Sequence, residues 1–309
     1  MAGLARRLRH DLVHAVTTAL LAGTRRGSLP GLRRLGRSAA RLTVALNTRQ
    51  RALARANIAA AFPDRNAAWQ DELLRRSIAH FGDLLGEVLW LAHASEEEIL
   101  EHSHFEGLSH LLDNARPPDG AILVTGHCGN WEWLGLSLGA SRVPMTAAAR
   151  EVYDPRLDDV VMRLRGRFGT ETVLRGPNAG RRLAAALAEG RVLGLLIDQD
   201  IDVPGAFVEF FARPAWTPTG AAVLALRRRS PVVTGFALRE PDGSFRIRFE
   251  PVELPPPGGK LKEQAARLTA LCTARTETAI RECPEQWVWM HHRWRRQPGA
   301  DERVWGPGS

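Results

Sequence analysis

The segment Ala121–Gly135 reads AILVTGHCGNWEWLG, and it decides the fold of this chain. Its first five residues, Ala121–Thr125, form an apolar run with the length and composition of a buried strand. The turn Gly126–Asn130 follows, and Trp131–Ala140 has the apolar character of a helix. A buried strand that passes through a tight turn into a helix is the repeating unit of α/β sheets. Such sheets bind ligands beyond the carboxyl ends of their strands.

The same alternation of short apolar runs and amphipathic stretches continues from about residue 106 onward. The further strands that it predicts are Val143–Ala148, Glu171–Leu174, Val192–Ile197 and Val232–Ala237. The further helices are Pro155–Phe168, Asn178–Glu189, Thr219–Arg229 and 260–282. Ser244–Glu250 alternates with period two, which suits an edge strand. This pattern therefore predicts an α/β fold with a mixed, largely parallel central sheet flanked by helices.

The amino-terminal third lacks this alternation and has the pattern of helices. Apolar residues recur at helical spacing over Ala68–Ala94, and Ser95 followed by Glu96–Glu98 is typical of a capped helix start. We therefore expect a helical region over 1–105, an α/β core over 106–300 and a tail over 301–309. A chain of 309 residues is long enough for such an arrangement.

Positive charge is concentrated at the amino terminus. Residues 1–60 hold twelve arginines and one acid, Asp11, whereas the whole chain has a net charge of +8. Apolar residues from Leu4 to Leu20 recur at helical spacing beside the first arginines, so this region could lie on an anionic membrane surface. It could equally pack on the main domain with a solvated basic face. No apolar stretch reaches the roughly 20 residues that a spanning helix needs.

The composition and motifs argue against several other classes of protein. The three cysteines have no paired spacing, which argues against a disulfide scaffold or a structural zinc site. No zinc finger, basic zipper or RNP-like aromatic pattern accompanies the basic charge, so nucleic-acid binding is not expected. No GxSxG elbow precedes a helix, so a serine hydrolase is not supported, and the sequence lacks the GxxxxGK[ST] and GxGxxG motifs of phosphate loops and dinucleotide sites.

His127 lies at the strand–helix junction, where open sheets bind ligands, and Glu132 follows five residues later. A carboxylate that accepts a hydrogen bond from one imidazole nitrogen fixes the tautomer and leaves the other nitrogen basic. The pair could therefore be a general base and its orienting partner. Two alternatives stay open: both residues could be polar positions of a junction, or Cys128 could be a nucleophile.

The motif GHCGNWE resembles the HxxxxD/E motif of the glycerolipid and lysophospholipid acyltransferases, and its flanks resemble their lipid A branch. Further segments that are similar to this branch follow in family order. They are ANIAAAFPD (Ala56–Asp64), RGRFG (Arg165–Gly169), IDQD (Ile197–Asp200), VEFFARPAWTPTG (Val208–Gly220) and PEQWVWMHHRW (Pro284–Trp294). Together these segments span most of the chain.

The resemblance implies acyl transfer from an acyl carrier protein thioester to a hydroxyl group of a lipid A precursor, without a metal or diffusible cofactor. It implies His127 as the general base and Glu132 as its partner. The residues expected to bind substrate are Asn130, Arg150, Asp198, Gln199 and Asp200. Arg150 could instead be a solvated loop charge, and the two aspartates could be structural anchors. The family also implies the cytoplasmic face of a bacterial inner membrane, with peripheral or monotopic attachment.

Two departures from the family pattern stand out: the amino terminus is polar and rich in arginine, and Ala212 stands where glycine is frequent. The sequence leaves two other functions open. One is acyl transfer to a different acceptor, such as a lysophospholipid or a phosphatidylinositol mannoside. The other is a non-catalytic basic protein that binds membranes or nucleic acid.

Overall fold

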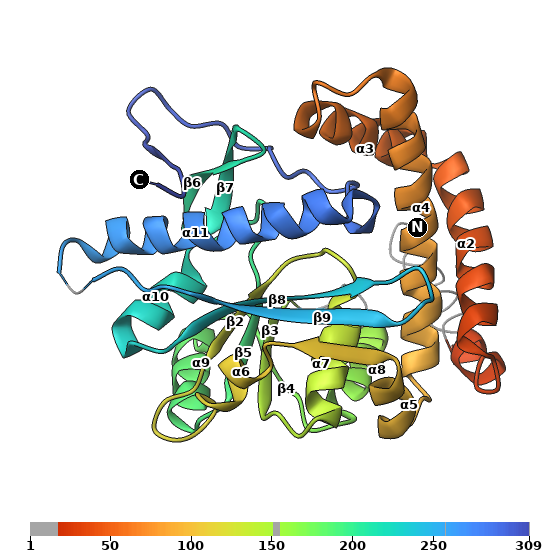
Figure 1. Ribbon diagram of the computed structural model, residues 1–309, viewed down its shortest axis with the longest axis horizontal. Coiled ribbons are helices and arrows are strands. Elements are labelled where there is room, and N and C mark those ends of the chain that lie inside the picture. The colour runs from red at the N-terminus through yellow and green to blue at the C-terminus, as the bar shows by residue number, and fades with distance from the viewer. Residues whose placement is uncertain (1–17, 151–154, 257, 309) are drawn as a thin grey trace, which may run out of the picture.

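The computed structural model describes residues 18–150, 155–256 and 258–308 (Figure 1). A seven-stranded sheet has the order β1-β9-β8-β2-β5-β3-β4, and a three-stranded sheet has the order β10-β6-β7. The large sheet consists of β1 (Ser103–Glu106), β2 (Ile122–Thr125), β3 (Met145–Ala149), β4 (Glu171–Leu174), β5 (Val192–Leu196), β8 (Val232–Arg239) and β9 (Phe245–Val252). The small sheet consists of β6 (Gly205–Phe210), β7 (Arg213–Pro218) and β10 (Val304–Trp305).

Helices precede and flank the large sheet. In the amino-terminal region they are α2 (Leu29–Leu46), α3 (Thr48–Ala61), α4 (Ala67–Leu91) and α5 (Glu96–Glu101). In the rest of the chain they are α6 (Ser109–Leu112), α7 (Trp131–Ala140), α8 (Pro155–Gly166), α9 (Ala179–Ala188), α10 (Gly220–Arg228), α11 (Leu261–Glu282) and the 3₁₀ turn η1 (Pro284–Gln286). The expected fold, a mixed and largely parallel sheet flanked by helices and preceded by a helical region, is confirmed.

Parallel pairing gathers the carboxyl ends of four neighbouring strands at one edge of the sheet. Strands β2, β5, β3 and β4 are adjacent in that order, and each pair is parallel. The register places Thr125 opposite Leu196, and Ala149 opposite Leu174. Residues that directly follow these strands therefore meet at the same edge.

Both faces of the sheet are covered, which explains the unbroken apolar run at its centre. Leu123 packs in a cluster with α7 and the end of α4, whereas Ile122 and Val124 pack in a second cluster with α9, α10 and α11. In a strand that is buried on both faces, apolar side chains are favoured at every position, so polar and apolar residues do not alternate. The helical layers lie on either side of the sheet in Figure 1.

The expectation of an edge strand at Ser244–Glu250 is wrong. Strand β9 pairs with β8 on one side and with β1 on the other, so β1 is the edge strand. Burial alternates along most of β9, because one of its faces is covered more than the other. Alternation with period two therefore shows that the two faces of a strand are buried unequally, and it does not show whether the strand lies at the edge of the sheet. Strand β1 spells SHFE, and this short segment has no apolar run to reveal it.

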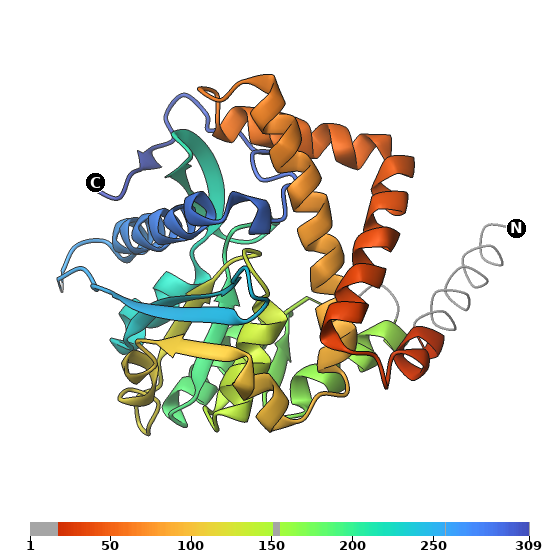
Figure 2. The ribbon, with the colours of Figure 1, turned by 45° about the vertical axis from the view of Figure 1, so that its right-hand side comes forward.

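Helices α2 and α4 pack against each other at a closely spaced contact built on glycine (Figure 2). A Cβ atom on Gly36 would lie 2.0 Å from the carbonyl oxygen of Gly82. A Cβ atom on Gly86 would lie 2.3 Å from the carbonyl oxygen of Leu32. The two backbones therefore approach more closely than any residue with a side chain would permit.

A buried ion network joins this helix pair to the α/β core. Glu87 of α4 is fully buried, and it accepts hydrogen bonds from Arg33 of α2 at 2.8 Å and from Arg239 of β8 at 2.5 Å. The Asn130 side chain donates to Glu87 at 2.8 Å, and Arg239 also pairs with Asp83 at 3.2 Å. A buried carboxylate is tolerated when it is paired in this way. The helical region is thus part of the same packed body as the sheet.

We predict that Gly82→Ala lowers the free energy of unfolding by about 1–3 kcal/mol, because its Cβ would meet backbone atoms of Arg37 and Gly36 within 2.7 Å. Gly135 of α7 is the matched control, since a Cβ there meets nothing within 4 Å. Gly135→Ala should raise the free energy of unfolding by about 0.5–1 kcal/mol through helix propensity. Urea denaturation measures both. Equal effects of the two substitutions would contradict the close α2–α4 contact.

Candidate active site

The turn between β2 and α7 is fixed by contacts to strand β8. Gly129 has a φ of +67°, and a Cβ atom there would lie 2.0 Å from the carbonyl oxygen of Ala237. The Asn130 backbone N–H donates to that same oxygen at 2.9 Å. The Asn130 side chain accepts a hydrogen bond from the Trp133 backbone at 2.9 Å and so caps α7. Glycine and asparagine at these two positions thus determine where His127 lies.

His127 is bound to the carboxylate of Asp198, which lies in the loop that follows the neighbouring strand β5. Its Nδ1 lies 2.7 Å from Asp198 Oδ1, and its backbone N–H donates to Asp198 Oδ2 at 2.7 Å. The indole N–H of Trp287 also donates to Asp198 Oδ2, at 2.8 Å. With the proton on Nδ1, Nε2 is the acceptor nitrogen of the ring, and the Gln199 side-chain amide donates to it at 3.4 Å.

The contacts of Asp198 favour its charged form. Burial by itself would raise the pKa of Asp198, but the neighbouring His127 and its hydrogen bond, together with His291 and the Trp287 indole, hold the pKa well below its usual value. The side chain is 1% exposed. Asp198 is therefore a buried carboxylate at neutral pH, and its charge stabilises an imidazolium at His127.

Glu132 has a different partner from the one that the sequence analysis expected. Its carboxylate accepts two hydrogen bonds from Arg165 of α8, one of them from Nε at 3.0 Å. Glu132 lies in the first turn of α7 beside α8, whereas His127 Nδ1 faces Asp198, which lies just beyond the carboxyl end of β5. The histidine and its carboxylate thus come from adjacent strands. The order of strands in the sheet, which is not visible in the sequence, brings them together.

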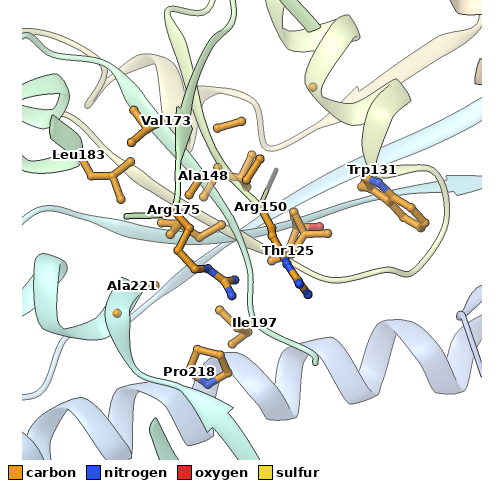
Figure 3. Close-up of a pocket in the computed structure, with 18 of the residues that line it drawn as sticks. Thr125, Trp131, Ala148, Arg150, Val173, Arg175, Leu183, Ile197, Pro218 and Ala221 are labelled. Atoms are coloured by element: carbon orange, nitrogen blue, oxygen red, sulfur yellow. The ribbon is translucent and has the colours of Figure 1, made fainter. Parts of the chain in front are cut away.

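A cavity of about 720 Å³ opens beside His127, at the carboxyl edge of the sheet. Its wall includes His127, Glu132 and Gln199 together with Arg150, Arg165 and Arg175. Most of the remaining wall is apolar and includes Leu134, Met145, Ala147, Val173, Leu183, Leu195, Ile197, Ala221 and Val223. Figure 3 shows arginine side chains extending into the same space as the apolar ones. The cavity can hold an acyl chain beside a few polar groups.

The expected site residues fall into two groups. His127, Glu132, Arg150 and Gln199 line the cavity. The others, Asn130, Asp198 and Asp200, lie outside that lining, and each is buried or bonded within the protein. Asn130 is fully buried and bonds to Trp133 and Glu87, Asp198 bonds to His127, and the fully buried side chain of Asp200 bonds to Arg295 and Arg296.

Neither Cys128 nor the aromatic residues of the VEFFARPAWTPTG segment line the cavity. Burial raises the pKa of the Cys128 thiol well above its usual value, so this thiol is a poor nucleophile. Phe210 and Phe211 pack with Trp287 and Trp289 in a buried cluster. This aromatic cluster contacts the loop that carries His127 through Trp287, whose indole N–H donates to Asp198.

Sequence reasoning missed three contacts of the site: Asp198 as the partner of His127, Arg165 as the partner of Glu132, and Arg175 in the wall. Asp198 did have a signal, since it ends the most apolar strand and so lies at the ligand-binding edge of an α/β sheet. Arg165 begins the family-like segment RGRFG, but nothing in the sequence connects it to Glu132, and Arg175 has no signal that separates it from the many other arginines.

Comparisons with known proteins agree on one family. The model of the family described as bacterial lipid A biosynthesis acyltransferase matches residues 9–296. The lipid A biosynthesis lauroyltransferase of Escherichia coli (strain K12) is 25% identical over 274 residues, which is 87% of each chain. The lipid A biosynthesis palmitoleoyltransferase of the same strain is 23% identical over 83% of this chain and 82% of its own. A phosphatidylinositol mannoside acyltransferase of Mycobacterium tuberculosis (strain H37Rv) is 27% identical over 74% of this chain and 72% of its own.

His291 predicts a pH dependence of stability. Burial, with smaller contributions from His127 and Arg293, outweighs Asp198 and lowers the pKa of His291 from 6.5 to about 4. Between these values the unfolded chain binds a proton that the folded chain does not. The free energy of unfolding should therefore fall as pH drops from 6.5 to about 4, by about 3 kcal/mol from this group.

Urea denaturation across that pH range measures the effect in wild type, His291→Gln and the exposed control His104→Gln. We expect His291→Gln to flatten the pH dependence and His104→Gln to leave it unchanged. A pH dependence that is the same in all three proteins would contradict a neutral, buried His291.

Proposed function

Because this chain belongs to the bacterial lipid A biosynthesis acyltransferase family, we propose that it transfers a fatty acyl chain from acyl carrier protein to a hydroxyl group of a lipid A precursor. One observation carries this proposal. His127 has one nitrogen bound to Asp198, and its other nitrogen faces a largely apolar cavity of about 720 Å³. That is the arrangement that a general base for a lipid hydroxyl requires.

The reaction proceeds by direct transfer. The acceptor hydroxyl gives its proton to His127 Nε2 while its oxygen attacks the thioester carbonyl. The tetrahedral intermediate then collapses, the carbon–sulfur bond breaks, and the imidazolium returns the proton to the departing thiol. An ester forms and a thioester is consumed, with no covalent intermediate on the protein. Because the thioester is already activated, catalysis reduces to alignment, proton transfer and stabilisation of the oxyanion.

The polar residues around His127 have distinct roles in this scheme. Asp198 orients His127 and stabilises its charged form, and Trp287 holds Asp198. Gln199 lies 3.4 Å from His127 Nε2, and its amide can donate to the developing oxyanion. Glu132 is paired with Arg165, which also lines the cavity, so we assign Glu132 a positioning role through that ion pair.

We predict that His127→Ala lowers kcat by at least ~10²-fold, the scale of a lost general base. Cys128→Ser is the matched control on the neighbouring residue, and it should keep wild-type turnover, since that thiol is buried and lies outside the cavity lining. Release of thiol from acyl carrier protein thioester, in the presence of acceptor, measures both. Wild-type turnover in His127→Ala would remove His127 from the mechanism, and a large loss in Cys128→Ser would point to a cysteine nucleophile.

A second acceptor class is a phosphatidylinositol mannoside, because acyltransferases named for that lipid also match this chain, at 26% and 27% identity over 72% and 74% of it. The deciding assay offers the purified protein a lipid A precursor and a phosphatidylinositol mannoside separately, each with acyl carrier protein and coenzyme A thioesters. Transfer to the lipid A precursor supports the first proposal. Transfer to the mannoside alone replaces it, and transfer to neither overturns both.

We also propose that the enzyme attaches to an anionic membrane surface through α2. Residues 1–17, which contain most of the apolar pattern expected to touch the membrane, lie outside the described residues. Within the described ranges, none of the helices is long and apolar enough to cross a bilayer. Leu35 and Leu42 of α2 are 50% and 65% exposed, and the exposed Arg34 and Arg41 lie beside them. An exposed apolar stripe with adjacent arginines suits an interface with anionic lipid.

Sedimentation with lipid vesicles tests this attachment. Binding should rise with the content of anionic lipid and fall as salt rises from about 0.1 to about 0.5 M, because the attraction is screened. Replacing both Leu35 and Leu42 with serine should weaken binding, whereas Leu112→Ser, at a leucine that is 47% exposed on α6, should not. Equal binding by all variants, or binding that ignores lipid charge, would exclude this face.

A further inference from the structure

Two arginines stand side by side at the carboxyl ends of adjacent parallel strands. Arg150 directly follows β3, and Arg175 directly follows β4. The last residues of these strands, Ala149 and Leu174, are partners in the register, and the Arg175 backbone N–H donates to the Ala149 carbonyl at 2.9 Å. Arg150 and Arg175 are therefore neighbours across the sheet.

Both side chains line the cavity, and Figure 3 shows them extending from the strand ends into the same space. Arg165, the third arginine of the wall, is paired with Glu132. By contrast, the side chains of Arg150 and Arg175 have no carboxylate partner among the residues that the structure describes. Asp158, the other carboxylate of the wall, has an interaction of its own and acts on Arg165. Two like charges opposite each other on neighbouring strands repel, so an anion between them is favourable.

The amino terminus of α9 adds positive potential at the same place. Gly176–Asn178 leads directly from Arg175 into α9, and Ala179 and Gly180 line the cavity. No side chain caps this helix, because the Asn178 amide oxygen accepts from Arg181 instead. A Cβ on Gly180 would meet nothing within 4 Å, so a ligand can approach the backbone there. An uncapped helix start favours anions, and phosphates above all.

We propose that Arg150, Arg175 and the amino terminus of α9 form a subsite for a phosphate group of a substrate. This inference rests on the proposed function and adds to it a charge-recognition element. Arginine binds phosphate through two parallel N–H···O hydrogen bonds, and two arginines with a helix start can surround its oxygens.

The position of the subsite relative to His127 defines which substrates fit. Along the sheet the order is β2, β5, β3, β4, so His127 and the two arginines are separated by two to three strand spacings. At about 4.8 Å a spacing, the phosphate lies roughly 10–15 Å from the reacting hydroxyl and thioester. Two sources carry a phosphate at such a distance: the 4′-phosphopantetheine arm of the acyl donor and a phosphorylated sugar of the acceptor.

Calorimetric binding to the full-length protein tests the subsite without turnover. The probes are 4′-phosphopantetheine and glucosamine 1-phosphate, each compared with its form that lacks the phosphate. The variants are Arg150→Gln, Arg175→Gln and their combination. The control is Arg182→Gln, since Arg182 is exposed on α9 and lies outside the cavity lining.

We expect wild type to bind at least one phosphorylated probe at least ~10-fold more tightly than its dephosphorylated form, and each single variant to lose about tenfold in affinity for it. The control should bind like wild type. The probe that responds identifies the donor or the acceptor as the source of the phosphate. In steady-state assays the KM for that substrate alone should rise.

Undiminished binding of the phosphorylated probes by the double variant, or no preference for phosphate in wild type, would overturn the subsite. The proposed function fails differently. If wild type binds the phosphorylated probe through both arginines but transfers no acyl chain to any acceptor, the subsite stands and acyl transfer does not.

Discussion

The carboxylate of Asp198 is the interaction on which the rest of the site depends. It accepts hydrogen bonds from His127 Nδ1, from the His127 backbone and from the Trp287 indole, all within 2.8 Å. These three donors tie together the loop after β2, the end of β5 and the carboxyl-terminal segment. A Cβ on Gly126 would lie 3.0 Å from the carboxyl carbon of Asp198, so glycine at the start of the loop lets this carboxylate approach closely. The buried negative charge fixes the tautomer of His127 and directs its free nitrogen at the cavity.

The same loop is held from its other side by the helical region. Asn130 caps α7 and donates to Glu87 of α4, and Glu87 in turn pairs with Arg33 of α2 and Arg239 of β8. The close packing of α2 on α4 fixes where Glu87 lies. Helices that are remote in sequence from the loop after β2 therefore help to position His127. This explains why the helical region and the sheet form one packed body.

The sequence predicted the fold class because β2 and its neighbours are buried on both faces and read as apolar runs. It also located His127, since a histidine after such a strand lies at the ligand edge. It did not predict that Asp198 binds His127, because that contact depends on β5 pairing with β2. Because His127 and Glu132 are only five residues apart, the sequence suggested that they bind each other. In the structure the partner of His127 is instead Asp198, which is distant in sequence and lies after the adjacent strand. The edge strand β1 gave no signal, since SHFE has neither an apolar run nor alternation.

The central claim is that Asp198, and not Glu132, fixes the protonation of His127. The nitrogen chemical shifts of the His127 imidazole, measured by NMR in wild type, Asp198→Asn and Glu132→Gln, test it directly. In wild type and Glu132→Gln the neutral imidazole should carry its proton on Nδ1 and leave Nε2 as the acceptor. Asp198→Asn should lose that preference. A wild-type tautomer that survives in Asp198→Asn but changes in Glu132→Gln would contradict the account.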